Sequence, residues 1–350
     1  MKPFIFALAL LATQSVFAQD FNNLGISAAI DAVTPIYIQS AGENKMGIRG
    51  AELSLYGPLD PFFDGKLTMA AHDENGEQFF ELHEAYIQSA RLLPSLRAKV
   101  GRFFLGVGRL NQLHQHDWPF ITAPRSHAQF FDKEGVADSG LELAYLLPAN
   151  RFWEIQFGVT NGYTYGHTHS AGQRPHIPTH YIHPTTYWEL SETTGLQLGL
   201  NYLGRTSFDK YQNQIFGFDL TFKDRDGKTL AWLVQSEFYY RKLSHPVEKT
   251  QEFVGGYVYP EKGFDERNSL GVRFDLFSET SRTFLTTSDR RKNLHYALAP
   301  TYTFRSSEFA KWRVAYTYQA DTQQGDVDDI EQKVELQFTL ILGDHPAHDF

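Results

Sequence analysis

The sequence contains no cysteine, which excludes disulfide bridges and thiolate metal sites from all 350 residues. Methionine is scarce at three residues, and after the first 18 residues no apolar run approaches the roughly 20 residues that a membrane-spanning helix needs. A surplus of positive charge is missing too, since the formal net charge is −9. This charge argues against a nucleic-acid partner. Aromatic residues are abundant instead, with 29 Phe and 18 Tyr, a usage typical of β-strands and membrane-interface girdles.

The first residues have the features of a secretory signal peptide. Lys2 precedes the apolar run PFIFALALLATQSV, and Val16 and Ala18 fit the small-residue positions before a cleavage site. A buried or anchoring helix is the weaker alternative, because the run is too short to span a bilayer. We therefore expect a signal peptide over residues 1–18 and a single mature domain over residues 19–350.

An alternation of apolar and polar residues recurs along the mature chain. In IFGFDLTFK, which starts at Ile215, Phe216, Phe218, Leu220 and Phe222 alternate with polar or small residues, whereas an amphipathic helix would repeat every 3.6 residues. The segments are about ten residues long, the length that crosses a bilayer when tilted, whereas soluble strands usually have about five or six. One apolar, aromatic face and one polar, charged face are typical of a transmembrane barrel.

The connections between these segments differ in length from one side to the other. The turns on one side, such as PANR and DRDGK, are short and rich in Pro, Gly, Asp or Ser. Outer-membrane barrels have short periplasmic turns and longer extracellular loops. The sequence therefore predicts an all-β fold, a transmembrane antiparallel β-barrel of about 16 strands in the outer membrane of a Gram-negative bacterium, surrounded by lipid. The expected extracellular connections are 33–46, 74–77, 105–138, 162–180, 205–213, 243–252, 278–291 and 320–329.

Three of the segments alternate poorly. QFFELHEAYIQS places Glu81 and His83 on one face and Glu84 on the other, and LRAKVGRFF and HPTTYWEL show little period. Either a subunit interface covers these strands in place of lipid, or the register assigned to them is wrong.

Several short motifs stand in order between Gly57 and Phe104. They are the D-P-x-x-D-G turn at 60–65, the E-A-Y strand at 84–86 and the K-x-G-R-F-F strand at 99–104. This combination resembles the early strands of the phosphate-selective porin O/P-like family. The segment LHQHDWPFITAPRSHAQFF and the ending LILGDHPAHDF are similar to a branch often described as zinc-regulated outer-membrane proteins. The resemblance implies a passive porin-like channel for small hydrophilic solutes or ions, a homotrimer, and no required cofactor.

The lumen charges do not support phosphate selectivity. A phosphate pore should present a surplus of Lys and Arg to its lumen. The polar faces of the clearest strands carry equal numbers of each sign, so the phosphate specificity of the family is not carried over. The positive residues are Lys66, Lys223, Arg241, Arg273, Arg313 and Lys333, and the negative ones are Glu142, Glu154, Asp219, Glu237, Asp275 and Glu335.

The connection 105–138 is the longest and follows the fifth expected strand. A barrel of about 16 strands leaves a water-filled channel, so a loop folded inward would set the bore, and both charge signs on it would create a transverse field. The alternative is a loop packed over its own aromatic residues outside the barrel. The charged residues expected at this constriction are Arg109, Asp117, Arg125, Asp132, Lys133 and Glu134.

Histidines gather in the connections 105–138 and 162–180. Neutral imidazole binds zinc, copper and nickel, and histidine-rich tracts are typical of metal binding. Because no spacing here is as diagnostic as a zinc-finger pattern, we expect weak, multi-site binding of zinc or another divalent ion, linked to its uptake. The alternative is a solvated loop, or a surface that responds to mild acid. The candidate ligands are His114, His116, His167, His169, His176, His180 and His183.

Two other classes of function compete with the channel. An outer-membrane enzyme is weakly indicated by Ser170 beside His169, but a nucleophile and its base are recognised by spatial roles and not by adjacency in sequence. We therefore expect no enzyme. A structural or adhesive barrel would differ from a channel in a single observation, because the reconstituted protein would show no ion conductance.

Overall fold

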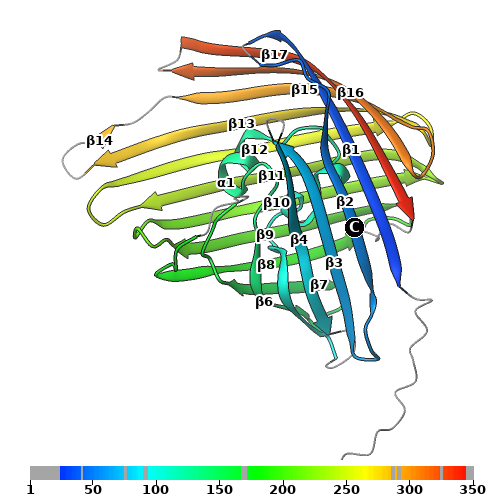
Figure 1. The fold of residues 1–350 in the computed structure, drawn as a ribbon, viewed down its shortest axis with the longest axis horizontal. Helices are drawn as coiled ribbons and strands as arrows, with labels where there is room; N and C mark the ends of the chain where they lie inside the picture. The colour runs from blue at the N-terminus through cyan, green and yellow to red at the C-terminus, as the bar shows by residue number, and fades with distance from the viewer. Residues whose placement is uncertain are drawn as a thin grey trace, which may run out of the picture.

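The structure is a computed structural model that describes residues 24–40, 42–74, 77–89, 94–166, 172–284, 288–289, 293–323 and 326–343. The expected signal peptide lies outside these residues and stays a prediction. Sixteen long antiparallel strands form one closed sheet in this part of the chain, and a two-residue strand, β14, extends the β13–β15 hairpin (Figure 1). The strands are β1 (Gly25–Gln39), β2 (Gly47–Pro58), β3 (Phe63–Glu74), β4 (Glu77–Ser89), β5 (Leu96–Phe104), β6 (Ala137–Leu146), β7 (Phe152–Thr160), β8 (Ile177–Glu189), β9 (Thr194–Thr206), β10 (Gln212–Asp226), β11 (Thr229–Ser244), β12 (Lys249–Gly263), β13 (Asn268–Phe284), β14 (Ser288–Asp289), β15 (Leu294–Arg305), β16 (Ala310–Gln323) and β17 (Asp326–Gly343).

The barrel closes where the first strand meets the last. β1 pairs with β2 on one side and with β17 on the other, with Ala29 opposite Ile341 in the β17 register. Closure removes the free sheet edge, so that the backbone N–H and C=O groups are paired without water. This confirms the expected antiparallel barrel.

The two faces of each strand have opposite chemistry. On β13, Phe274 and Leu276 point outward and are 51% and 50% exposed, whereas Arg273 and Asp275 between them are 3% and 2% exposed. A soluble protein rarely exposes apolar surface continuously around its circumference, but lipid requires such a surface. The protein is therefore an integral protein of the outer membrane of a Gram-negative bacterium.

The strands extend further on the extracellular side than the sequence predicts. β1 continues to Gln39, although a loop was expected from residue 33, and the expected loops 205–213 and 243–252 shorten to 207–211 and 245–248. Backbone pairing continues there between residues such as Lys242 and Glu252. Because the strand ends beside the loops 207–211 and 245–248 are mostly polar on both faces, alternation no longer marks the strands there, whereas the end of β1 keeps the exposed apolar Ile36 and Ile38. The two longest connections are 105–136 and 161–176, and the predicted end of the second at 180 is wrong, since β8 begins at Ile177.

A β-bulge explains the irregular pattern of β4. Thr68 pairs with Glu84 and Met69 with Leu82, so that His83 is an extra residue in the ladder. A bulge turns two consecutive side chains toward the same side, and His83 and Glu84 are both buried, at 7% and 6% exposure. The expectation that Glu84 lies on the opposite face is therefore wrong, and the register shift is the cause.

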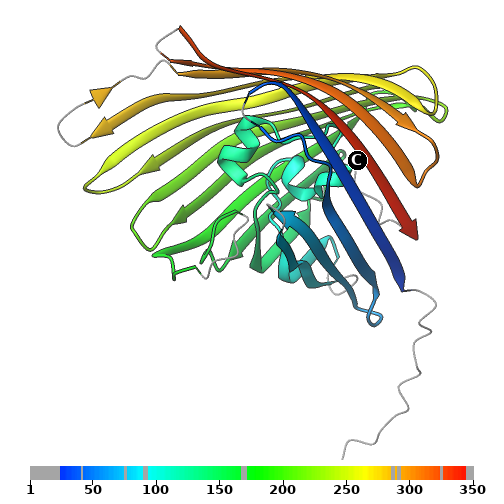
Figure 2. The same ribbon diagram turned by 45° about the horizontal axis from the view of Figure 1, so that its top comes forward.

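Among the residues that the structure describes, the helices all belong to the connection between β5 and β6. They are η2 (Leu110–Gln112), η3 (Gln115–Asp117) and α1 (Arg125–Phe131). None of the helices in the described ranges is long and apolar enough to cross a membrane. Figure 2 shows them enclosed by the strands, and they bring the connection 105–136, hereafter the inner loop, into the barrel.

Candidate functional site

The inner loop packs against the inner wall of the barrel through aromatic side chains. Trp118 and Phe120 are buried against Tyr257 and Tyr259 of β12, and Phe131 contacts Tyr239 of β11 at a ring distance of 4.9 Å. These contacts lie inside the barrel, opposite the strand β5 from which the loop departs. The loop therefore crosses the lumen and does not fold over itself outside.

Charged side chains of the wall hold the backbone of the inner loop. Arg273 donates to the carbonyl of Thr122, and Arg241 donates to that of Gln129 at 2.8 Å. Glu237 accepts the backbone N–H groups of Arg109 at 2.9 Å and Leu110 at 2.7 Å. Charge-assisted hydrogen bonds of this kind are roughly twice as strong as neutral ones, and they fix the position of the loop.

Two further cations of the wall hold the loop in the same way. Arg49 of β2 donates to the carbonyl of Ile121, and Lys311 of β16 donates to that of His116. The anchors thus come from β2, β11, β13 and β16, which lie on one side of the barrel, on the arc that runs from β11 through β17 and β1 to β2. Part of the lumen charge is therefore bound to the loop backbone, which the count of six positive and six negative lumen residues does not take into account.

Eight of the twelve lumen charges predicted from the sequence are Glu142, Glu237, Arg241, Arg273, Asp275, Arg313, Lys333 and Glu335, and most of them pair with one another or with neighbours on the inner wall. Glu142 lies 2.8 Å from Nζ of Lys99. The other contacts are Arg273 to Asp275 at 3.2 Å, Lys333 to Glu335 at 3.3 Å and Arg313 to Gln337 at 3.1 Å, beside the loop contacts of Glu237 and Arg241.

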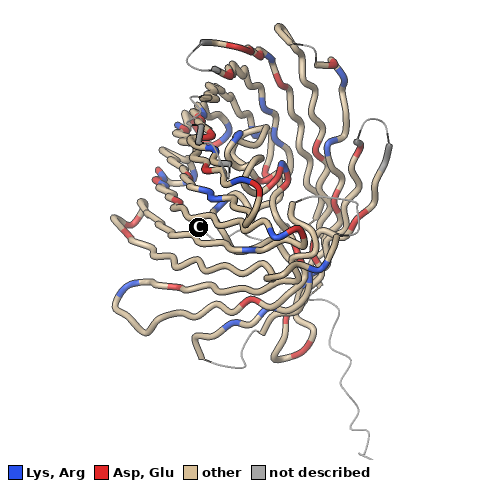
Figure 3. Tube along the Cα trace, turned by 90° about the vertical axis from the view of Figure 1, so that its left-hand side faces the viewer, with Lys and Arg blue, Asp and Glu red and all other residues tan. Residues whose placement is uncertain are grey.

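Three polar cavities lie between the inner loop and the side of the short turns. Their volumes are about 400, 420 and 410 Å³, and Arg109 lines all three. The first has seven basic and four acidic side chains in its wall. In Figure 3, basic and acidic positions occur along the same strands, separated by long stretches without charge. The basic residues of the first cavity are Arg109, Lys223, Arg225, Lys228, Arg305, Lys311 and Arg313, and the acidic ones are Asp117, Glu261, Asp265 and Glu266.

The six residues expected at the constriction do not converge on one point. Arg109 and Asp117 line cavities, and Arg125 lies 3.9 Å from Asp321 of β16. Lys133 is exposed, Asp132 has a positive φ of 76° at the end of α1, and Glu134 turns toward a group of histidines. Arg109 is thus the member of the set that lines all three cavities.

The histidines of the second long connection are separated by the structure. His167 and His169 lie outside the described residues, and His176 is exposed. His180 faces outward beside Tyr202, whereas His183 faces inward, with its Nε2 3.0 Å from Oδ2 of Asp219. Both belong to β8, and residues three apart in a strand point to opposite faces. His180 and His183 therefore do not share a metal ion.

Four other histidines form a buried stack between the inner loop and the wall. The ring centroids of His72 and His83 are 4.9 Å apart, those of His83 and His114 5.7 Å, and those of His114 and His116 5.6 Å. His72 and His83 come from β3 and β4, and the other two from the inner loop. Each of the four is at most 7% exposed.

Carboxylates surround the loop end of this histidine stack. Oε2 of Glu52 lies 2.8 Å from Nδ1 of His114, whose Nε2 lies 3.0 Å from Glu84. Burial alone would lower the pKa of His114, but Glu52 and Glu84 outweigh it and raise the pKa to about 10. For His116, burial is likewise outweighed by Asp117 and Glu52, and its pKa rises to about 9. Both rings are therefore imidazolium ions that attach the inner loop to the wall.

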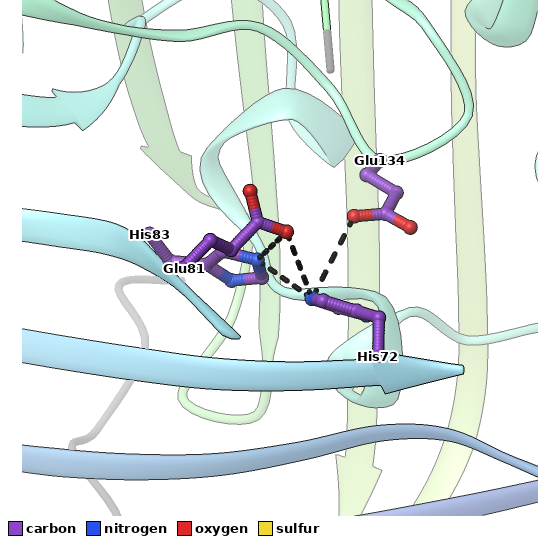
Figure 4. A group of neighbouring side chains, drawn as sticks. All are labelled: His72, Glu81, His83 and Glu134. Atoms are coloured by element: carbon purple, nitrogen blue, oxygen red, sulfur yellow. Dashed lines mark hydrogen bonds and ion pairs between the residues drawn. The ribbon is translucent and has the colours of Figure 1, made fainter. Parts of the chain in front are cut away.

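The wall end of the stack brings four potential metal donors together (Figure 4). Nε2 of His72 lies 2.9 Å from Nε2 of His83, 3.4 Å from Oε1 of Glu81 and 3.9 Å from Oε2 of Glu134. Nε2 of His83 lies 3.6 Å from the same oxygen of Glu81. Two imidazoles and two carboxylates are a donor set that zinc accepts in proteins.

His72 and His83 were not predicted as metal ligands from the sequence, because no short histidine spacing connects them and only the pairing of β3 with β4 brings them together. The tight β3–β4 hairpin places Ala70 opposite Glu81 and His72 opposite Phe79, so that His72 and Glu81 are diagonal neighbours. The bulge then turns His83 inward. The contact of His72 with Glu81 follows from pairing the residues on either side of the short 74–77 connection as a hairpin. The inward direction of His83 depends on the bulge and does not follow from that pairing.

No family model matches the chain. A protein of Aquifex aeolicus described as uncharacterized is 25% identical over 335 residues, which cover 86% of this chain and 69% of that protein. Among solved structures, the outer-membrane channel DcaP of Acinetobacter baumannii has a TM-score of 0.63 at 8% identity, covering 91% of this chain and 97% of that one. The anion-selective porin of Comamonas acidovorans has a TM-score of 0.61 at 10% identity, covering 91% and 99%. The trimer form of the outer-membrane protein OmpT of Vibrio cholerae has a TM-score of 0.61 at 7% identity, again covering 91% and 99%.

The fold is that of an outer-membrane porin. At these identities the likeness concerns the barrel and not the residues that line it. The phosphate-selective and zinc-regulated branches suggested by the sequence therefore have no support from these matches, and the lining described above has to be interpreted by its own chemistry.

Proposed function

We propose that the protein is a porin-like channel, without enzymatic activity, through which small hydrophilic solutes and ions diffuse passively across the outer membrane. The observation that carries this proposal is the set of three polar cavities beneath an inner loop that narrows a 16-stranded barrel. A barrel of this size leaves an aqueous path, and polar side chains along it suit hydrated solutes. A structural or adhesive barrel has no need for such cavities.

The charges of the first cavity favour a modest preference for anions. Its seven basic and four acidic residues give a local surplus of 7 − 4 = 3 positive charges. Acidic residues that partly compensate this surplus, such as Glu261 beside Arg305, keep the preference small. Reconstituted in planar bilayers with a KCl gradient, the protein should conduct, and its reversal potential should indicate a chloride preference of about two- to fivefold, as expected for a lightly charged pore.

Two variants test the origin of that preference. The double change Arg225→Gln and Lys228→Gln should move the reversal potential toward zero, because both residues line the first cavity. Arg151→Gln is the matched control, since it removes a positive charge from an exposed turn on the same side where the guanidinium stacks over Trp188. Absence of conductance in the wild type would contradict the channel and favour the structural barrel.

Divalent-metal uptake is a second candidate function. The observation that favours it is the wall end of the buried histidine stack, where the rings of His72 and His83 lie 4.9 Å apart. A barrel used for uptake should carry zinc as a permeant ion. The same bilayer measurement in a ZnCl₂ gradient would then show a zinc current, and a channel that passes chloride only would argue against this role.

We further propose that the protein assembles as a homotrimer through the short wall of the barrel. β5, β6 and β7 have 9, 10 and 9 residues, against 15 to 17 in β10–β13. In the described residues β4 pairs with β5 only through Ala85–Gln88, and Phe80 above this pairing is 82% exposed. A short wall with an incompletely paired strand suits contact with a second chain, and the structural neighbour from Vibrio cholerae is described as a trimer form.

Changing Phe80→Ala should weaken this trimer, because an aromatic anchor at the centre of an interface carries much of its energy. Light scattering of the detergent-solubilised protein should show trimer for the wild type and a larger monomer fraction for the variant. Trp312→Ala on β16, whose side chain is 49% exposed on the long wall, should leave the trimer intact. Equal dissociation of both variants would argue against this interface.

A further inference from the structure

We propose that His72, Glu81, His83 and Glu134 form a binding site for one divalent transition-metal ion of the zinc type, which fastens the inner loop to the barrel wall. This site goes beyond the proposed channel, because it does not require that the barrel conducts. It also differs from the metal site expected in the connection 162–180, with which it shares no residue.

The spacing of the donor atoms fits a small tetrahedral ion. With bonds of about 2.0–2.1 Å, the ligand atoms of tetrahedral zinc lie roughly 3.3 Å apart. Four of the six separations here are 2.9, 3.4, 3.6 and 3.9 Å, which bracket that value, and all the donor atoms lie within 4.8 Å of one another. Side-chain rotations would bring the more distant donors to the spacing of a bound ion.

The tautomer of His72 favoured by its surroundings leaves Nε2 of this ring to face the other donors. Nδ1 of His72 lies 3.1 Å from the carbonyl oxygen of Arg49, which can only accept, so the ring proton sits on Nδ1 and Nε2 is left as a ligand. Nδ1 of His83 faces Oε1 of Glu52 at 3.9 Å. The two Nε2 atoms lie 2.9 Å apart and share a hydrogen bond, which an ion coordinated by both nitrogens would replace.

Space and charge also fit an ion. A cavity of about 20 Å³ adjoins the site and is lined by His72, His83 and Glu134. This is about the size that holds one water molecule, and it leaves room for an ion with an open position. Two carboxylates supply two negative charges, which match a dication bound by two neutral imidazoles. Calcium and magnesium prefer oxygen ligands throughout, so the two nitrogens favour zinc, copper or nickel.

The elements that supply the donors define what the ion does. His72, Glu81 and His83 belong to the β3–β4 hairpin, whereas Glu134 stands at the end of the inner loop, just before Gly135. An ion bound to all four cross-links the loop to the wall beside the part of β4 that does not pair with β5. We therefore infer a metal-dependent restraint on the element that narrows the lumen.

The test uses the full-length protein purified in detergent, stripped with EDTA and equilibrated with Zn²⁺. Mass spectrometry of the bound metal should find one zinc per chain at low micromolar free zinc, and Co²⁺ in its place should give the visible absorption of a tetrahedral site. The variants His83→Ala and Glu134→Gln should each lower the affinity at least tenfold, as the loss of a ligand does. Glu134→Gln is nearly isosteric and tests the site where His83→Ala fails to fold, which heat-modifiable migration on gels reveals.

A matched control separates this site from the histidines of the other connection. The triple change of His167, His169 and His176 to Ala should leave one zinc per chain. Loss of zinc in that control with retention in Glu134→Gln would overturn the proposal, as would a wild type that binds no zinc at 100 micromolar. Zinc binding by a protein that shows no conductance would leave this site standing and contradict only the channel.

Discussion

Replacing residues 107–134 by a short Gly-Ser linker should raise the single-channel conductance several-fold. The inner loop carries the buried side chains of Trp118, Phe120, Phe130 and Phe131 into the lumen, and all of this volume becomes water in the variant. A 16-stranded barrel without an obstructing loop leaves a wide aqueous channel. Bilayer recordings at equal voltage and salt would measure the increase.

The barrel should survive this change because its hairpin is closed without the loop. The backbone N–H of Leu105 bonds the carbonyl of Val136 at 3.0 Å, so the two ends of the inner loop are already adjacent. The wall cations that now hold loop carbonyls, such as Arg241 and Arg273, would face water and remain solvated. Replacing 172–175 in the other long connection is the control and should leave conductance unchanged. An unaltered conductance in the inner-loop variant would mean that the loop does not set the bore.

The strands were the part of the structure that local sequence could predict. On β10 and β13 each residue alternates between lipid and lumen, so that Phe218 and Phe274 identify the outer face from their own neighbours. This period fails at the extracellular strand ends beside the loops 207–211 and 245–248, where both faces are mostly polar, and at His83, where one extra residue shifts the register. Neither the continuation of a strand nor the extra residue can be recognised from the amino-acid composition of the segment.

The site was less predictable because its contacts join segments far apart in the chain. The inner loop was correctly expected to be distinctive, but its direction depends on anchors such as Glu237, which is 128 residues from Arg109. Glu237 and Arg273 were recognised as lumen residues from the alternation, but the backbone groups of the inner loop that they bind could not be predicted. The histidine stack likewise needs three independent facts: the tight hairpin, the bulge and the docking of the inner loop against β2 and β4.

Changing Glu52→Gln should release the inner loop, because Glu52 is the carboxylate shared by its two buried imidazolium ions. It lies 2.8 Å from Nδ1 of His114 and 3.5 Å from Nδ1 of His116. Removing one partner of a buried ion pair costs about 3–5 kcal/mol, since the other charge stays buried. Glu84 and Asp117 still face the two rings in the variant, and Lys66 competes for Glu84 at 2.5 Å. The attraction that remains in the variant is therefore weaker than the attraction that Glu52 supplies in the wild type.

The effect should depend on pH in a defined direction. Because the pKa of His114 is raised to about 10 and that of His116 to about 9, the ion pairs contribute fully below the unfolded value of 6.5 and are lost as pH rises through 9–10. In Glu52→Gln both pKa values fall, so the loop should loosen at a lower pH than in the wild type. The EDTA-stripped protein avoids any contribution from bound metal.

Trp118 reports this release directly. It is fully buried in the inner loop, whereas Trp153, Trp188, Trp232 and Trp312 lie on strands and are 38% to 49% exposed on the outer face. Acrylamide quenching of Trp fluorescence should therefore rise in Glu52→Gln from neutral pH upward, and in the wild type only above about pH 9, where the shifted histidines titrate. Glu261→Gln is the matched control, because the Glu261 side chain is also largely buried, at 3% exposure against 10% for Glu52, but pairs with Arg305 of the wall at 3.4 Å and not with the inner loop. If Glu52→Gln and Glu261→Gln give the same quenching profile, the imidazolium pairs do not hold the loop, and the aromatic contacts to Tyr239 and Tyr257, together with wall anchors such as Glu237 and Arg241, keep it in the lumen.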